Sequence, residues 1–71
     1  MISKVEPKNL NKGDWVKTLD GVYEVVDIDK EELHLELAEV LFVDDESDEY
    51  SLIKNYNWSF SEFRSTDFRR A

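Results

Sequence analysis

The pair Asp20-Gly21 lies between two segments rich in β-branched and aromatic residues, and it constrains the fold more than any other feature of the chain. Residues 15–19 precede the pair and residues 22–28 follow it, and both segments suit a pleated surface. Asp-Gly favours a type I′ turn, which requires a positive φ at both central residues. We therefore predict a β-hairpin over residues 14–28. Strand alternation places its second-strand side chains in two sets: Val22, Val26 and Ile28 on one face, and Tyr23, Val25, Asp27 and Asp29 on the other.

The length of the chain limits the size of its core. With 71 residues it forms one domain, 1–71, in which a single hydrophobic core is only marginally sufficient. The chain contains no cysteine, so neither a disulfide nor a thiolate zinc site contributes to its stability. Stability must come from the apolar residues, which include nine aromatics, or from association with a partner.

Residues 33–43 permit two interpretations. Leucines and a valine at odd positions alternate with His34 and Glu36, a pattern typical of a strand. The same segment has helix-favouring composition, so a helix over residues 31–43 is the alternative. We favour the strand because residues 29–32 make a good hairpin loop. The apolar residues change parity at Glu39-Val40, which predicts a β-bulge or a sharp bend there.

The remaining segments are assigned more directly. Residues 44–49 are acidic and must form a solvated loop, and residues 50–56 are typical of another strand. Ser59 and Glu62 have the spacing of a capping box, which predicts a short helix or 3₁₀ turn near residues 60–66. The fold class predicted is therefore mainly β: a small, partly open barrel of four to five antiparallel strands with a short C-terminal helical turn.

Residues 11–29 resemble the opening hairpin of small SH3-like barrels, the broad group that includes modules with a KOW motif. The resemblance rests on Gly13-Asp14 with Val16, on Asp20-Gly21, and on the valine-rich strand that follows. KOW-type modules carry a further glycine and basic residues after the turn, where this chain has Tyr23 and Glu24. The resemblance therefore implies the barrel and not an RNA-binding role.

Catalytic and cofactor signatures are missing from the sequence. His34 is the only histidine, and no recognisable motif pairs a nucleophile with it. Two glycines cannot build a glycine-rich phosphate loop. A calcium-binding EF-hand loop starting at Asp44 would need glycine at position 49 and glutamate at position 55, where the chain has Glu49 and Asn55. We expect no enzyme activity, no cofactor and no metal.

Acidic residues are concentrated in the middle of the chain. From Asp20 to Glu49 there are thirteen acidic side chains and one basic one, Lys30, a local charge of -12 in a chain of net charge -8. Such a surface repels phosphate, so we expect no direct binding to nucleic acid. It attracts a basic partner instead. The candidate partner-binding residues are Asp27, Asp29, Glu31, Glu32, Glu36, Asp44, Asp45, Glu46, Asp48 and Glu49.

In size, charge and lack of cysteine the chain resembles phage-encoded inhibitors of host defence, such as DNA-mimicking anti-CRISPR and anti-restriction proteins. That resemblance implies a partner with a basic nucleic-acid-binding groove, such as a nuclease. The N-terminal residues lack the apolar segment of a signal peptide, and the longest apolar run, residues 40–43, is far shorter than the roughly 20 residues of a membrane span. We expect no membrane association and a cytoplasmic location, that of the host if the protein is phage-encoded.

The aromatic and basic C-terminal tail supports a second hypothesis. Its aromatics either close the bottom of the barrel or form an exposed patch, since aromatics and arginine are enriched at the centres of interfaces. In the second case the chain is an SH3-like adaptor that docks onto a larger complex, and homodimerisation through the tail is a further expectation. The residues concerned are Trp15, Tyr23, Trp58, Phe60, Phe63 and Arg64.

Overall fold

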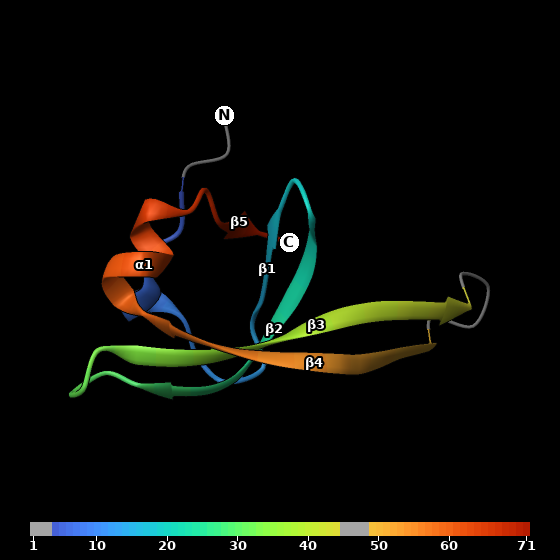
Figure 1. The fold of residues 1–71 in the computed structure, drawn as a ribbon, viewed down its shortest axis with the longest axis horizontal. Coiled ribbons are helices and arrows are strands. Elements are labelled where there is room, and N and C mark those ends of the chain that lie inside the picture. Colours follow the sequence, from blue (N-terminus) through green and yellow to red (C-terminus); the bar gives the residue numbers. More distant parts are fainter. Residues whose placement is uncertain (1–3, 45–48) are drawn as a thin grey trace.

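The computed structural model describes residues 4–44 and 49–71 (Figure 1). Its elements follow in chain order: the 3₁₀ turn η1 (Pro7–Asn9), β1 (Trp15–Thr18), β2 (Gly21–Asp29), β3 (His34–Asp44), β4 (Glu49–Ser59), the helix α1 (Phe60–Ser65) and β5 (Arg69–Arg70). The predicted mainly β fold is confirmed. The alternative of a helix over residues 31–43 is wrong, because β3 occupies most of that segment and pairs with strands on both sides.

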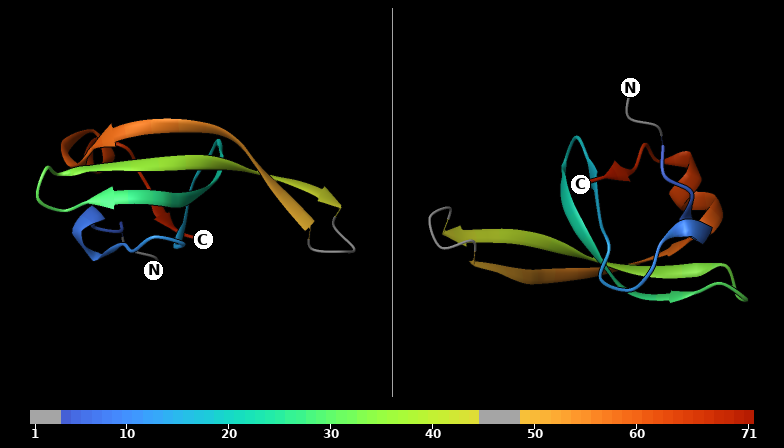
Figure 2. Two further views of the ribbon diagram at one scale, coloured as in Figure 1. Left: turned by 90° about the horizontal axis from the view of Figure 1, so that it is seen from below. Right: turned by 180° about the vertical axis from the view of Figure 1, so that it is seen from behind.

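The strands form one open antiparallel sheet in the order β4-β3-β2-β1-β5. The first four strands follow one another as a meander, and the short β5 returns to pair with β1, where Val16 faces Arg70. The helix α1 connects β4 to β5, and the chain curls back over one side of the sheet (Figure 2). We call this the inner side of the sheet and the opposite one the outer side. The two edges of the sheet are β4 and β5.

The β1–β2 hairpin is present, but its turn differs from the predicted one. Thr18 pairs with Gly21, so the two turn residues are Leu19 and Asp20, one position earlier than Asp20-Gly21. Among the described residues a positive φ occurs only at Gly13 (96°) and Leu33 (59°), so the type I′ prediction is wrong. The Thr18 hydroxyl accepts the Asp20 N–H at 3.1 Å, a local bond that fixes a turn of negative φ.

The register of β2 against β3 shifts between Val25 and Asp27, where β2 carries one extra residue. Because of this bulge Ile28 returns to the core side, together with Tyr23 and Val25. The predicted set of Val22, Val26 and Ile28 on one face is therefore wrong, since it assumed an unbroken alternation.

A second register shift lies where the sequence predicts one. Ala38 pairs with Asn55 and Val40 pairs with Leu52, so β4 has one extra residue opposite Glu39. The bulge predicted at Glu39-Val40 is confirmed at that level of the sheet, although the extra residue belongs to the neighbouring strand.

The core lies between the inner side of the sheet and the helix. It consists of Leu10, Val16, Val25, Leu35, Leu37, Phe60, Phe63 and Phe68. The helix begins at the predicted capping box: the Ser59 hydroxyl accepts the Glu62 N–H, and the Glu62 carboxylate accepts the Ser59 N–H. This cap fixes the start of α1, and α1 in turn places Phe63 against Phe68 in a stacked pair 4.3 Å apart.

Beyond the centre of the sheet, β3 and β4 continue as a ribbon of two strands (Figure 1). The last pair between β2 and β3 on this side is Tyr23 with Glu39, whereas β3 and β4 pair as far as Asp44 and Glu49. We call residues 40–44 and 49–52 the β3–β4 ribbon. In the part of the chain that the structure describes, no helix is long and apolar enough to cross a membrane.

The two glycines provide a test of the turn geometry. Gly13 has a φ of 96°, a conformation that side chains with a Cβ avoid. Gly21 has no positive φ, and a Cβ added there would meet its nearest atom at 3.9 Å.

We expect Gly13→Ala to lower the free energy of unfolding by about 1–2 kcal/mol, measured by urea denaturation. Gly21→Ala should leave it unchanged or raise it slightly, and equal losses at the two positions would contradict the assigned turns.

Candidate functional site

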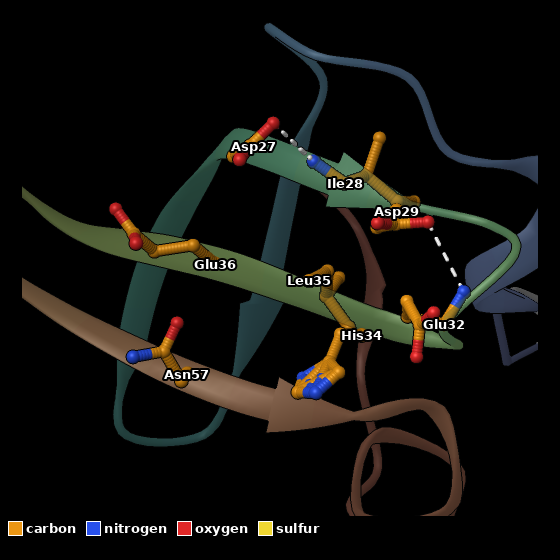
Figure 3. Close-up of a pocket in the computed structure, with 8 residues that line it drawn as sticks. All are labelled: Asp27, Ile28, Asp29, Glu32, His34, Leu35, Glu36 and Asn57. Atoms are coloured by element: carbon orange, nitrogen blue, oxygen red, sulfur yellow. Dashed lines mark hydrogen bonds between the residues drawn. The ribbon is translucent and has the colours of Figure 1, made fainter.

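Four carboxylates surround a shallow depression on the outer side of β2 and β3 (Figure 3). Asp27 and Asp29 come from β2, Glu32 from the loop after it, and Glu36 from β3. The depression has a volume of about 270 Å³ and is widely open to solvent. Its lining is completed by Ile28, His34, Leu35 and Asn57. We call Asp27, Asp29, Glu32 and Glu36 the acidic face.

The pairing of the strands explains why these side chains meet. Asp27 is the register partner of Glu36, and Asp29 is the partner of His34. Directly paired residues of an antiparallel sheet project to the same side. Leu35 and Leu37, which flank Glu36 along β3, point to the core, so the acidic face points to solvent.

The bulge in β2 gives the outer side of the sheet an additional carboxylate. Glu24 pairs with Ala38, two strand positions from Glu36, so Glu24 and Asp27 lie on the same side although they are three residues apart. An unbroken strand would place them on opposite sides. The Glu24 carboxylate already has partners, because Trp15 Nε1 donates to its Oε1 at 2.9 Å and the Tyr50 hydroxyl donates at 3.4 Å. We therefore assign Glu24 a structural role, in which its carboxylate links the side chains of Trp15 and Tyr50.

Within the acidic face the hydrogen bonds are local. Asp29 Oδ1 accepts the N–H groups of Glu31 and Glu32, both at 3.0 Å, and so orders the β2–β3 loop. Glu36 Oε2 accepts from Asn55 Nδ2 at 2.8 Å. These bonds orient the carboxylates and leave their charge in place.

No lysine or arginine lines the depression. The ion pairs Arg64–Glu6 and Arg70–Asp14 connect the N- and C-terminal segments, and the pair Arg69–Asp67 lies within the C-terminal one. The acidic face is therefore a concentration of negative charge without a paired cation in the described structure.

The structure separates the predicted acidic residues into groups. Glu31 is exposed on the β2–β3 loop beside the acidic face. Asp44 and Glu49 end β3 and begin β4 at the tip of the ribbon, ten residue steps or roughly 33 Å along β3 from His34. The predictions for Asp45, Glu46 and Asp48 lie outside the described residues. The acidic residues of β2 and those at the ribbon tip thus do not form one compact site.

The residues of the adaptor hypothesis are not brought together on the surface. Phe60 and Phe63 are 2% and 0% exposed, which makes them part of the core. Trp58 is half-buried against Phe68, with ring centroids 5.2 Å apart. Of the others, Tyr23 packs on the inner side, Trp15 lies on the outer side, and Arg64 pairs with Glu6. The tail aromatics therefore close the core, the first of the two interpretations.

Sequence reasoning missed His34 and Asn57 as part of this site, because they become neighbours of the carboxylates only through strand pairing. It also missed the alignment of Glu24 with Asp27. The sequence gives no clear signal for that alignment, because the strand has apolar residues at even positions (Val22, Val26 and Ile28) as well as at odd ones (Tyr23 and Val25).

Comparison with protein-family models, curated proteins and solved structures finds no match. In the described part of the chain there is no group of three or more histidine, aspartate or glutamate side chains placed to hold a metal ion. The interpretation of the acidic face therefore rests on its own geometry and charge.

The bonds made by Asp29 predict an asymmetry between two substitutions. Asp29→Ala removes the acceptor for two loop N–H groups, so we expect it to lower the free energy of unfolding by about 1 kcal/mol. Asp29→Asn keeps an oxygen acceptor at the same place and should cost much less. Urea denaturation of both variants measures this difference. If the charge of Asp29 and not its hydrogen bonds held the loop, both variants would lose the same amount of unfolding free energy.

Proposed function

We propose that this protein is a non-catalytic binding module that presents its acidic face to a basic nucleic-acid-binding groove of a partner protein and so occludes that groove. The supporting observation is that the depression is lined by four carboxylates and no cation. The proposed site of action is the cytoplasm, that of the host if the protein is a phage-encoded anti-defence inhibitor.

The spacing of the carboxylates supports mimicry of a phosphate backbone. Asp27 and Asp29 are two positions apart on one side of β2, a distance of about 6.6–6.8 Å along a strand. That is about twice the axial rise of 3.4 Å per phosphate of one DNA strand. Glu36 on β3 adds a second row beside Asp27. A basic groove shaped for phosphates would meet charges at similar intervals on this face.

The net charge of the protein should control the rate at which it associates with a basic partner. A net charge of -8 on a small domain attracts a basic groove over distances comparable to the Debye length, about 8 Å at physiological salt. Association should therefore be fast at low salt and slow down as salt is added.

The adaptor alternative receives less support. Two of its proposed anchors, Phe60 and Phe63, are buried, which leaves no aromatic patch on the tail for a partner to contact. Trp15 already donates its indole N–H to Glu24 within the same chain.

We expect a pull-down from nuclease-treated lysate to retain nucleic-acid-binding proteins at low salt and to release them when duplex DNA or high salt is added. Release by DNA is the informative result, because it requires that the protein and the DNA compete for one surface. Retention of proteins that neither DNA nor salt displaces would point to apolar docking and would contradict occlusion by charge.

Neutralising the acidic face should weaken this binding. The variant Asp27→Asn, Asp29→Asn, Glu32→Gln, Glu36→Gln keeps the acceptor oxygens of the local hydrogen bonds while removing four charges. Since exposed charges are each worth about 0.2–1 kcal/mol, we expect the affinity for the captured partner to fall roughly 10- to 100-fold, with most of the change in the association rate, measured by surface plasmon resonance.

The matched control removes four carboxylates outside the acidic face: Glu6→Gln, Asp20→Asn, Glu39→Gln and Asp67→Asn. Both variants change the formal net charge from -8 to -4, because each loses four negative charges. A much smaller loss in the control supports recognition by the acidic face. Equal losses would mean that net charge alone governs binding, and the proposed site would be wrong.

The purified protein should not retard DNA or RNA in a gel at moderate salt. Phosphate is repelled by the acidic middle of the chain, and the basic residues of the two ends are few and partly paired with neighbouring acids. An electrophoretic shift assay with duplex DNA and single-stranded RNA checks this. Tight binding to either nucleic acid would overturn the proposed function.

A further inference from the structure

The β3–β4 ribbon lacks the third strand that a stable sheet needs. Beyond Glu39 no pairing with β2 remains, and a two-stranded ribbon is marginally stable in water unless further strands or a packed face support it. The rest of the chain supports the ribbon at two residues: Val40 is buried, and the Tyr50 ring packs edge-on against the Trp15 ring, with the ring centroids 5.0 Å apart. Leu41 and Leu52 are exposed to solvent.

The outer edge of this ribbon is β4, which has eleven residues and a strand neighbour on one side only. All its residues from 50 to 57 are exposed, including Ile53 at 52% and Leu52 at 42%. A long edge strand with exposed apolar side chains is a template for pairing with another chain, and proteins normally block such edges with charges, prolines or bulges. The bulge at Ile53-Lys54 and the single charge of Lys54 are the devices of this kind found on residues 50–59.

The distribution of charge indicates what kind of partner can pair with the β4 edge. Residues 50–59 contain no acidic side chain and one lysine, whereas β2 and β3 each carry three acidic residues. Two copies of a chain of net charge -8 repel each other over most of their surfaces. That repulsion is weakest where β4 meets β4, so a second copy is the occupant that this edge suits.

The opposite edge of the sheet is closed to the same kind of pairing. β5 has two residues, both arginine, and Arg70 contacts Asp14 and the Asn9 carbonyl oxygen of its own chain. A head-to-tail contact of β4 with β5 would be short and would leave free ends that polymerise. Pairing of β4 with its own copy about a two-fold axis is antiparallel, uses a long edge on both sides, and closes at two chains.

We propose that two copies of this protein form a dimer through antiparallel pairing of their β4 strands, centred near Leu52 and Ile53. The two ribbons then form a sheet of four strands, β3-β4-β4-β3, in which each copy supplies the support that the other ribbon lacks. The interface differs from the tail-mediated dimer expected from the sequence, because the tail aromatics are buried. It is independent of the function proposed for the acidic face.

Analytical ultracentrifugation over a concentration series tests the dimer. We expect the wild-type chain to approach twice its 8.4 kDa mass, and added salt to favour the dimer because it screens repulsion between the copies. Salt should have the opposite effect on capture of a basic partner, so failure of one proposal is distinguishable from failure of the other. A wild-type chain that stays monomeric at millimolar concentration would overturn the dimer.

Ile53→Lys and Leu19→Lys form a matched pair of variants. Both replace an exposed apolar side chain with a lysine, but Leu19 lies at the β1–β2 turn, away from β4. We expect Ile53→Lys to weaken dimerisation at least 10-fold while circular dichroism shows a retained fold, and Leu19→Lys to dimerise as the wild type does. Equal dimerisation of the two variants would place the interface elsewhere and contradict the proposal.

Cross-linking provides a readout that does not depend on destabilising the interface. The chain has no cysteine, so a single introduced thiol reports on its own surroundings. Under mild oxidation Leu52→Cys should form a disulfide-linked dimer much faster than Leu19→Cys, because the two-fold axis brings the two copies of residue 52 close together. Equal rates for the two variants would show that β4 does not pair with itself.

Discussion

The extra residue that β2 inserts between Val25 and Asp27 fixes what each side of the sheet contains. Before the bulge Tyr23 and Val25 face the core, and after it Ile28 does so. Without the bulge, the alternation that buries Val25 would turn Asp27 and Asp29 toward the core and Ile28 toward solvent. Burying unpaired carboxylates costs several kcal/mol each, so this register is strongly specified. The same residue thus secures both the core and the acidic face.

The core of so small a domain is completed by segments distant in sequence. Leu10 after η1, Phe63 in α1 and Phe68 before β5 all pack against the inner side of the sheet. The Val5 N–H donates to the Phe68 carbonyl oxygen, which ties the N-terminal segment to the C-terminal one. Aromatic side chains bury large apolar areas, which suits a chain that has neither disulfides nor metal clusters in its described part to stabilise it. The tail aromatics are therefore structural, and the two surfaces on which the proposals rest are the outer side of the sheet and its β4 edge.

Charge divides that remaining surface in two. The end of β2 and the start of β3 carry the acidic face, where the hydrogen bonds of Asp29 and Glu36 orient the carboxylates. Residues 50–59 of β4 carry one charge and several exposed apolar side chains. The first surface attracts cations over a long range, whereas the second is suited to short-range contact through backbone pairing and apolar burial. A dimer through β4 would present two acidic faces on one assembly, which gives an extended basic surface two points of attachment.

Local patterns in the sequence determined the elements of this fold. The β-branched and aromatic segments on either side of the turn specified the first hairpin, although the turn itself lies one residue earlier than predicted. Ser59 with Glu62 specified the start of α1, because a capping box acts within a few residues. The acidic residues of the middle segment and the apolar parity change at Val40 could likewise be recognised from the sequence. Tertiary structure alone decided the bulge at Val26, the burial of Phe60 and Phe63, and the meeting of Asp27 with Glu36. Each of these depends on which strand lies beside which and in what register, and register is set by burying one side of the whole sheet at once, a condition that no short segment contains.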